Sequence, residues 1–414
     1  MVRRYIFPVP KRGKQRAFSK PVAKKPAKNS LGQPPAIVRY VRHGTATTRI
    51  RLDRAKWCAQ LKDFMNRGEK HVINVLKKQR ILPEWKGVRC PRCKVGLLGP
   101  LTKFSEKGGG WGHRCNRGRI CGRRVAPHDF HPIFVHGSGT QTTPLADQAT
   151  MLFCGVAGCS QTSTHRILPK NHKVVSGVYS RMYAARAKYV GLKQKRIKFG
   201  KYESWKDVEA DEVDVAKGEE AEGTSRSRTP IVWEQWGGIV ERGAPETLVL
   251  IRLKPAKTKR RAPGPGAIRK RDWTPIARRW LARRKVILHT DGARTYRMKI
   301  PGVKHDYAVH KRKRAVINGR VVWIKPKFSR VRWHNIAAEG EPKKKLWVKT
   351  GTQIIDRAWQ QLRKHKGNLC AGPHSIALTH RVRSFQWEYW NTGKDLWQQT
   401  GELLQFLFKH EHAL

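Results

Sequence analysis

Residues 208–213 read VEADEV, and this run predicts a β-strand that carries Asp211 between the apolar residues Val208, Ala210 and Val213. Two later segments also join apolar residues to an acid: VILHTDG at 286–292 contains Asp291, and TGTQIID at 350–356 ends at Asp356. The chain has only 29 Asp and Glu against 88 Lys and Arg. Acids placed in apolar segments of so basic a chain require a structural or chemical reason.

Composition sets the outer limits. With 414 residues, the chain is long enough for two or three domains, and 15 Trp within 39% hydrophobic residues allow a sizeable core. The formal net charge of +59 indicates a polyanionic partner, and nucleic acid is the commonest one, so DNA is expected and RNA is the alternative. No apolar run is long enough for a membrane span, so no membrane partner is expected.

The N-terminal residues 1–52 contain no acid and are rich in Lys, Arg and Pro. Such a segment cannot bury a core, so we predict a disordered basic arm. It would act as a nuclear-import signal or a phosphate-binding tail. An organellar transit peptide is the alternative, but the arm lacks a clear amphipathic Arg/Ser helix, which favours a nuclear location.

The rest of the chain divides by pattern. Apolar residues at spacings of three and four predict a helix over 53–80, within a helical segment 53–87. Residues 131–200 are also predicted to be helical, either as a helix-turn-helix or as an ordinary packed helical pair. Beyond residue 201, strands are predicted at 208–215, 230–241, 246–253 and 285–290, with a helix at 273–281 before the last of them. This order predicts an α/β fold with a mixed sheet that begins antiparallel.

Four of the eight cysteines form a compact cluster consisting of Cys90, Cys93, Cys115 and Cys121. A pair of thiolates two residues apart is half of a tetrahedral zinc site, and glycines between the two pairs allow tight turns. We therefore predict a zinc ribbon over 88–130, structural and closed, in a reducing compartment. His113 could replace one cysteine in the ligand set. Cys154 and Cys159 are predicted to be buried thiols.

The three acids Asp211, Asp291 and Asp356 suit a different metal. Two carboxylates at strand ends and a third on a helix starting near Thr352 could hold two divalent cations about 3.5–4 Å apart. Mg²⁺ prefers oxygen ligands, and Mn²⁺ accepts the same set. Each acid also has an ordinary explanation: a surface strand residue, a turn, or a helix start favoured by the helix dipole.

The segment from about 205 to 405 resembles the Merlin-type group of DDE transposases. The likeness lies in the order of five segments: VEADEV at 208–213, HTDGARTY at 289–296, VKHDYAVHK at 303–311, KTGTQIIDRAW at 349–359 and RSFQWEYWN at 383–391. The resemblance implies an RNase H-like catalytic core over 201–405, with Asp211, Asp291 and Asp356 as catalytic, metal-binding residues. It also implies DNA strand cleavage and transfer at terminal inverted repeats by a homo-oligomer.

The chain departs from that family in two ways. The third acid of the family is usually Glu, and here it is Asp356, one methylene shorter. The interval from Asp291 to Asp356 is longer than usual, and the excess at about 311–348 predicts a basic β-hairpin with Asn318-Gly319 as its turn. Such a hairpin could grip DNA.

The sequence thus supports a DNA-binding protein that cleaves and joins strands by two-metal chemistry. The alternative is a catalytically inactive, domesticated copy that serves as a structural nucleic-acid-binding protein in chromatin or a ribonucleoprotein. A zinc-dependent transcription factor that uses only the N-terminal half is a third, weaker reading.

Overall fold

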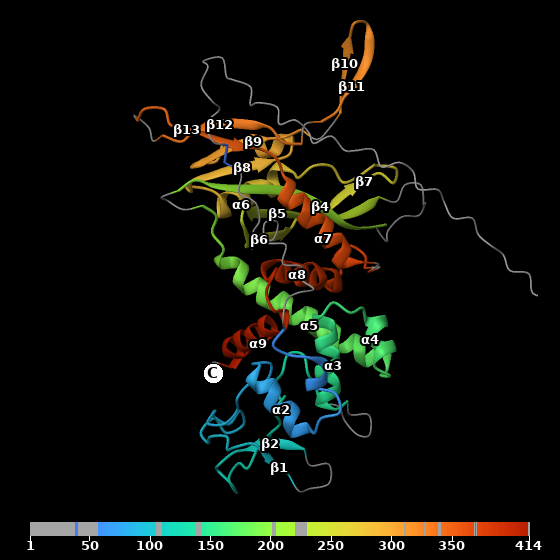
Figure 1. The fold of residues 1–414 in the computed structure, drawn as a ribbon, viewed down its shortest axis with the longest axis vertical. Helices are drawn as coiled ribbons and strands as arrows, with labels where there is room; N and C mark the ends of the chain where they lie inside the picture. The colour runs from blue at the N-terminus through green and yellow to red at the C-terminus, as the bar shows by residue number, and fades with distance from the viewer. Residues whose placement is uncertain are drawn as a thin grey trace, which may run out of the picture.

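The computed structural model describes residues 38–39, 57–104, 110–136, 143–200, 204–219, 230–309, 312–326, 328–337, 341–367, 369 and 371–412. The predicted basic arm over 1–52 lies outside these residues, apart from Val38 and Arg39. The described part is elongated: a small three-stranded unit occupies one end, helices fill the middle, and a larger sheet lies at the other end (Figure 1). Within it, no helix combines the length and apolar character that a membrane crossing requires.

The helix expected over 53–80 is interrupted. Its place is taken by a short 3-10 helix, η2 (Leu61–Asp63), and by α2 (Glu69–Lys78), while residues 53–56 lie outside the described part. Asn66 adopts a left-handed φ of 54°, which Asn tolerates better than most residues, and Gly68 is the N-cap of α2. The segment is therefore partly helical as predicted, but a turn divides it into two short helices.

The zinc-ribbon region forms a three-stranded antiparallel sheet in the order β1-β2-β3. Its strands are β1 (Thr102–Lys103), β2 (Trp111–Arg114) and β3 (Arg124–Val125). The strands are short because much of this region consists of turns around the four cysteines. Its small core contains two of those cysteines with Trp85, Leu98 and Val125.

The helical middle of the molecule shares one apolar core with the sheet domain. Its elements are α3 (Leu145–Val156), α4 (Gln161–Ile167), α5 (His172–Lys193), η4 (Gln194–Arg196) and the C-terminal α9 (Leu396–His412). The helix α5 packs along α8 (Ile376–Trp390), where Arg186 pairs with Glu388 at 2.6 Å. A DNA-reading helix-turn-helix in 131–200 remains a prediction.

The larger sheet has the order β6-β5-β4-β8-β9, with β7 paired to β5. Its strands are β4 (Lys206–Glu219), β5 (Ile231–Glu241), β6 (Ala244–Arg252), β7 (Ala256–Thr258), β8 (Val286–Thr290) and β9 (Val303–Tyr307). The first three strands are antiparallel, whereas β4, β8 and β9 run parallel to one another. The predicted α/β fold with a mixed sheet and an antiparallel start is confirmed, and the predicted strand positions agree closely.

Each face of this sheet buries a separate set of side chains. Val208, Ala210 and Leu288 pack with α6 (Lys270–Trp280) in one core. On the other face, Val213 and Val215 pack in the larger core with α7 (Gln353–Lys366) and α8. Because side chains alternate along a strand, the odd-numbered residues of β4 up to Val213 face α7 and the even-numbered ones face α6.

The interval 311–348 was expected to contain one basic hairpin and contains two separate antiparallel pairs. The first is β10 (Lys313–Ile317) with β11 (Arg320–Ile324), and the second is β12 (Val331–Asn335) with β13 (Lys345–Lys349). Positive φ angles at Asn318 (51°) and Gly319 (72°) produce the tight turn of the first pair, as its sequence predicts. The β10–β11 pair projects away from the body of the molecule (Figure 1).

Candidate metal centres

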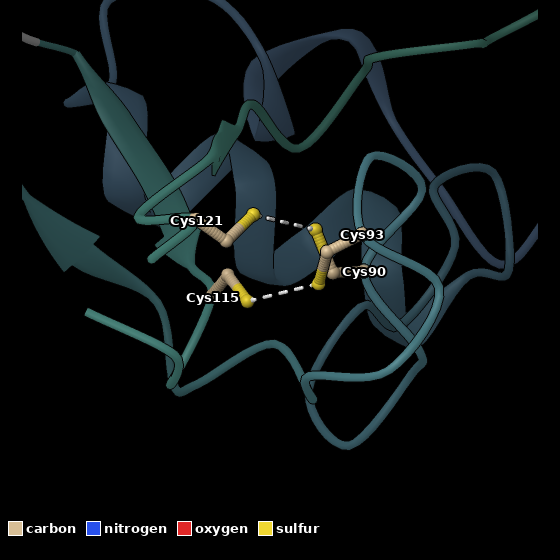
Figure 2. Close-up of side chains that lie close together, drawn as sticks. All are labelled: Cys90, Cys93, Cys115 and Cys121. Atoms are coloured by element: carbon tan, nitrogen blue, oxygen red, sulfur yellow. Dashed lines mark hydrogen bonds between the residues drawn. The ribbon is translucent and has the colours of Figure 1, made fainter. Parts of the chain in front are cut away.

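The four predicted cysteine ligands converge on one point in the ribbon (Figure 2). The Sγ atoms of Cys90 and Cys121 are 3.7 Å apart, and those of Cys93 and Cys115 are 3.8 Å apart. All four sulfur atoms lie within 4.8 Å of one another. In the described part of the chain, this is the only group of at least three His, Cys, Asp or Glu residues that meets this spacing.

The spacing matches a tetrahedral zinc ion. A Zn–S bond of about 2.3 Å places neighbouring sulfurs of a tetrahedron about 3.8 Å apart. Cys90 and Cys115 are buried and the other two are half-buried, so four thiolates would surround the ion and leave no position for substrate. The cluster is compatible with a closed, structural zinc site.

Local backbone geometry brings Cys90 and Cys93 together. Lys94 has a left-handed φ of 58°, and its N–H donates to the carbonyl of Cys90, closing a tight turn between the two ligands. The N–H of Gly96 donates to Cys93 Sγ at 3.3 Å. This bond and a second one from Val95 lower the pKa of the Cys93 thiol to about 6, which favours the thiolate that zinc binds.

Gly96 is also required for space. A Cβ atom at this position would lie 2.5 Å from Cys115 Sγ, so any other residue would push the second ligand pair away. The glycine therefore lets the two halves of the cluster approach each other.

His113 does not belong to the cluster. Its Nδ1 lies 2.8 Å from the carbonyl oxygen of Gly99, and its Nε2 lies 3.2 Å from Lys77 Nζ. Both ring nitrogens are thus engaged elsewhere, and the alternative ligand set containing His113 is wrong. Cys154 is buried at the end of α3 and Cys159 is half-buried just beyond it, and burial raises the pKa of the Cys154 thiol to about 11.

The three predicted acids meet at the sheet. Glu209 on β4 is paired in register with His289 on the parallel strand β8. Asp211 lies two residues further along β4, and Asp291 directly follows Thr290, the last residue of β8, so the two acids lie at the same end of neighbouring parallel strands. Asp356 lies in the first turn of α7, which packs on β4 and β5.

Asp211 is the electrostatic centre of this group. Burial raises its pKa well above the usual carboxyl range, and the nearby charges of Glu212, Asp356 and Asp291 raise it further. These three neighbours are all negative, so each of them disfavours the ionised form of Asp211. Such a site has the electrostatic character of a cation-binding site.

Hydrogen bonds fix the position of each predicted ligand. Trp359 Nε1 on α7 donates to Asp211 Oδ2 at 3.0 Å, and the indole packs over Gly238, where a Cβ atom would lie 2.4 Å from the ring. The N–H of Ala293 donates to Asp291 Oδ1 at 2.8 Å. Thr352 Oγ1 donates to Asp356 Oδ2 at 3.0 Å.

The neighbouring Glu212 points to the other side of the sheet. Its carboxylate accepts hydrogen bonds from Tyr296 Oη and, at 3.0 Å, from the N–H of Ile268. Burial is the main reason that its pKa is raised, and Asp291 contributes to the increase. Glu212 therefore shapes the electrostatics of the site from behind Asp211.

Two other acids on this face of β4, Glu209 and Asp207, form ion pairs with arginine or histidine. Glu209 and Arg242 form a fully buried ion pair at 2.8 Å. Asp207 pairs with His289 at 3.0 Å and with Arg39 at 2.9 Å. By contrast, Asp211 and Asp291 take part in none of the ion pairs among the described residues, although the chain carries 88 Lys and Arg.

Glu209 is a residue of this region whose structural role sequence reasoning missed. One carboxylate oxygen accepts from the N–H groups of Ile354 (2.8 Å) and Ile355 (3.0 Å), the first turn of α7. Its partner Arg242 donates to the carbonyls of Lys349 and Gly351 at 2.6 and 2.7 Å, just before α7. The pair ties the strand of Asp211 to the helix of Asp356. The acidic alternation along VEADEV was the available sequence signal, because it places Glu209 and Asp211 on one face.

A second buried network of polar groups surrounds His289, two residues before Asp291. The imidazole of His289 lies between Asp207 (Nε2, 3.0 Å) and Asp306 (Nδ1, 2.8 Å), and Asp306 also pairs with His334 on β12 at 2.9 Å. These two carboxylates outweigh the effects of burial and of Arg242, so the pKa of His289 is raised. These hydrogen bonds link β4, β8, β9 and β12 near the end of β8.

The two candidate centres differ in spacing. The carboxylate oxygens of Asp211, Asp291 and Asp356 do not form a group within 4.8 Å of one another, whereas the cysteine sulfurs do. One ion could not bind all three carboxylates at this separation. Two ions about 3.5–4 Å apart would allow a wider separation of the three carboxylates.

Comparison with known proteins gives no match: no family model, no curated protein and no solved structure is similar to this chain. The assignment of a function therefore depends on the residues and geometry described above.

Proposed function

We propose that residues 201–405 form an RNase H-like catalytic domain that cleaves and transfers DNA strands, with Asp211, Asp291 and Asp356 as ligands for two divalent cations. One observation carries this proposal. Three acids that are 80 and 65 residues apart in the sequence (211 to 291 to 356) come from β4, from the end of the adjacent parallel strand β8 and from the first turn of α7, which packs on β4. Two of them lack ion-pair partners among the described residues of a chain with a net charge of +59.

The arrangement of elements supports the proposal. Asp211 lies on the central strand β4, Asp291 follows the adjacent parallel strand β8, and Asp356 lies on α7, which packs on β4 and β5. Strand ends and helix starts hold side chains more rigidly than loops do. This rigidity suits a site that must keep several carboxylates close together against their mutual repulsion.

The three carboxylates fit Mg²⁺ or Mn²⁺ by ligand type and charge. When bound, such ions supply an activated water or 3′-hydroxyl and stabilise the leaving oxygen of a phosphodiester. The protein contributes orientation. Trp359 donates to one oxygen of Asp211, while Thr352 and the N–H of Ala293 orient the other two acids.

Strand nicking and transfer on supercoiled DNA test this function. Asp291→Asn removes a ligand charge without changing the size of the side chain, and should lower the Mg²⁺-dependent rate by at least about 10³-fold, since several kcal/mol of transition-state stabilisation would be lost. Asp214→Asn is the matched control, because Asp214 is an exposed acid on the same strand. Equal rates for wild type and Asp291→Asn would exclude the catalytic site.

A second function has its own support. The wide spacing of the carboxylates and the extreme positive charge favour a catalytically inactive protein that binds nucleic acid as a structural component. The same assay separates the two functions. Tight, salt-dependent DNA binding without nicking by the wild type, in either Mg²⁺ or Mn²⁺, would assign the structural role.

A further inference from the structure

The β10–β11 hairpin, hereafter the ribbon, exposes an unusual amount of apolar surface. All five residues of β11 are exposed, and Val316 on β10 and Trp323 on β11 are 68% and 61% exposed. A two-stranded hairpin is marginally stable by itself, and exposed apolar clusters of this kind mark interaction sites. The ribbon therefore requires a partner to cover it.

Both faces of the ribbon are apolar. In the antiparallel register, Val316 is opposite Val321, and Arg314 is opposite Trp323, so these four residues share one face. Ala315 opposite Val322 and Ile317 opposite Arg320 form the other face. The ribbon thus has apolar side chains on both faces, with Arg314 on one face and Arg320 on the other.

The charge of the surrounding segment identifies the partner. Between Asp306 and Glu339 the sequence contains no acid, and its Lys and Arg residues are Lys311, Arg312, Lys313, Arg314, Arg320, Lys325, Lys327, Arg330 and Arg332. A second copy of this chain would bring the same positive charge against it and be repelled. A polyanion would be attracted along the whole segment.

We propose that the ribbon is an arm that enters a groove of double-stranded DNA, where its arginines bind phosphates and its apolar side chains insert at a base step and bend the duplex. The proposal builds on the DNA substrate proposed above. A two-stranded ribbon fits a DNA groove, and apolar side chains inserted between base steps kink DNA by about 20–90°.

The connection of the ribbon to the acids supports this role. Its strands lie between β9, which follows Asp291, and the β12–β13 pair, which leads into α7 and Asp356. The strand before the hairpin and the strand after it are joined to each other, because Asp306 on β9 pairs with His334 on β12 at 2.9 Å. A duplex held by the ribbon would therefore be bent next to the three acids.

DNA bending by the full-length, zinc-loaded protein tests the proposal. The probe is a duplex of about 30 base pairs with a fluorophore at each end, short compared with the persistence length of DNA, studied without added Mg²⁺. Wild type should bring the two ends closer together. The double variant Val316→Ser with Trp323→Ser should abolish that change and weaken binding by about 5- to 150-fold, the range found when base-stacking side chains are removed.

A second variant tests the phosphate contacts. Arg314→Gln with Arg320→Gln should lower the slope of log affinity against log salt by about 1.8, because each lost phosphate contact contributes about 0.9. Ile376→Ser is the matched control, since Ile376 is an apolar residue that is 72% exposed on α8, away from the ribbon. It should leave both bending and affinity unchanged.

The outcomes separate this proposal from the catalytic one. Asp291→Asn should bend DNA as wild type does even though it cannot nick, so loss of nicking alone would leave the ribbon proposal intact. Unchanged bending and affinity in the Val316/Trp323 variant would overturn it. So would a wild type that self-associates through the ribbon while that variant is monomeric and bends DNA normally, because the ribbon would then cover a second copy of the chain.

Discussion

The cysteine cluster and the acid group are built in opposite ways. The four sulfurs already lie at the spacing of a bound zinc ion, with neighbouring pairs 3.7 and 3.8 Å apart. The three carboxylates stay further apart, and burial among like charges raises the pKa of Asp211. Thiols are neutral when protonated and can approach one another without a metal, whereas carboxylates repel.

The difference shows how each centre is held together. In the zinc-ribbon region, turns within about 30 residues bring the four cysteines into place, and Gly96 leaves room for Cys115. In the acid group, the buried Glu209–Arg242 pair joins segments that are far apart in the sequence, through hydrogen bonds to Ile354 and Ile355 and to the carbonyls of Lys349 and Gly351. The first centre should depend on its metal for folding, and the second should fold without a metal and gain chemistry from it.

The largest effect is expected from Cys90→Ser. Structural zinc contributes about 10–16 kcal/mol of binding free energy that is also folding free energy. Loss of one ligand should therefore release the ion and unfold the zinc-ribbon region. Zinc content by elemental analysis should fall from one ion per chain to near zero, and amide exchange over 88–130 should become rapid. His113→Gln is the control, and its zinc content should equal that of wild type. Retained zinc in Cys90→Ser would remove the four-cysteine site.

A smaller effect is expected from Arg242→Met, which leaves Glu209 buried without its charge partner. Breaking a buried ion pair costs about 3–5 kcal/mol, and urea unfolding should show a loss of that size. Lys206→Met is the matched control on β4, because Lys206 and Glu241 form a partly exposed pair at 3.6 Å worth about 0–1 kcal/mol. A cost equal to the control would mean that the Glu209–Arg242 pair does not hold α7 on the sheet.

The smallest effect concerns Asp211, and its sign is opposite. The folded protein binds the Asp211 proton more tightly than the unfolded chain does, so stability falls as pH rises from the ordinary carboxyl range through the raised pKa of Asp211. Asp211→Asn removes this penalty. Without divalent metal it should stabilise the protein at neutral pH by about 0.5–2 kcal/mol, the usual gain from an optimised charge.

Thermal unfolding at two pH values measures this change. The gain from Asp211→Asn should vanish in acid, where wild-type Asp211 is protonated in the folded and the unfolded state alike. The exposed control Asp214→Asn should show no such pH-dependent gain. A destabilised Asp211→Asn protein at neutral pH would indicate that the charge of Asp211 is compensated in the folded state.

The sequence predicted much of this architecture because its strongest signals are local. The pair Cys90 and Cys93 indicated the zinc-ribbon region, and Asn318-Gly319 indicated a tight turn. The apolar runs predicted most strands of the larger sheet to within a few residues. Local signals failed where a turn divided a periodic segment, as at Asn66. They also failed within 311–348, where two hairpins replaced the one expected.

By itself, then, the sequence determined the ligand types, the overall charge and the order of helices and strands, because each of these depends on residues that are near in the chain. Only the tertiary structure decided that His113 lies outside the zinc cluster, that Glu209 fixes α7, and that Asp211 and Glu212 point to opposite faces. These outcomes depend on which groups meet in the folded chain: His113 meets Lys77, Glu209 meets the start of α7 145 residues away, and the two acids of β4 face opposite sides of the sheet. Burial and like-charge repulsion act on such distant neighbours, and the sequence alone does not name them.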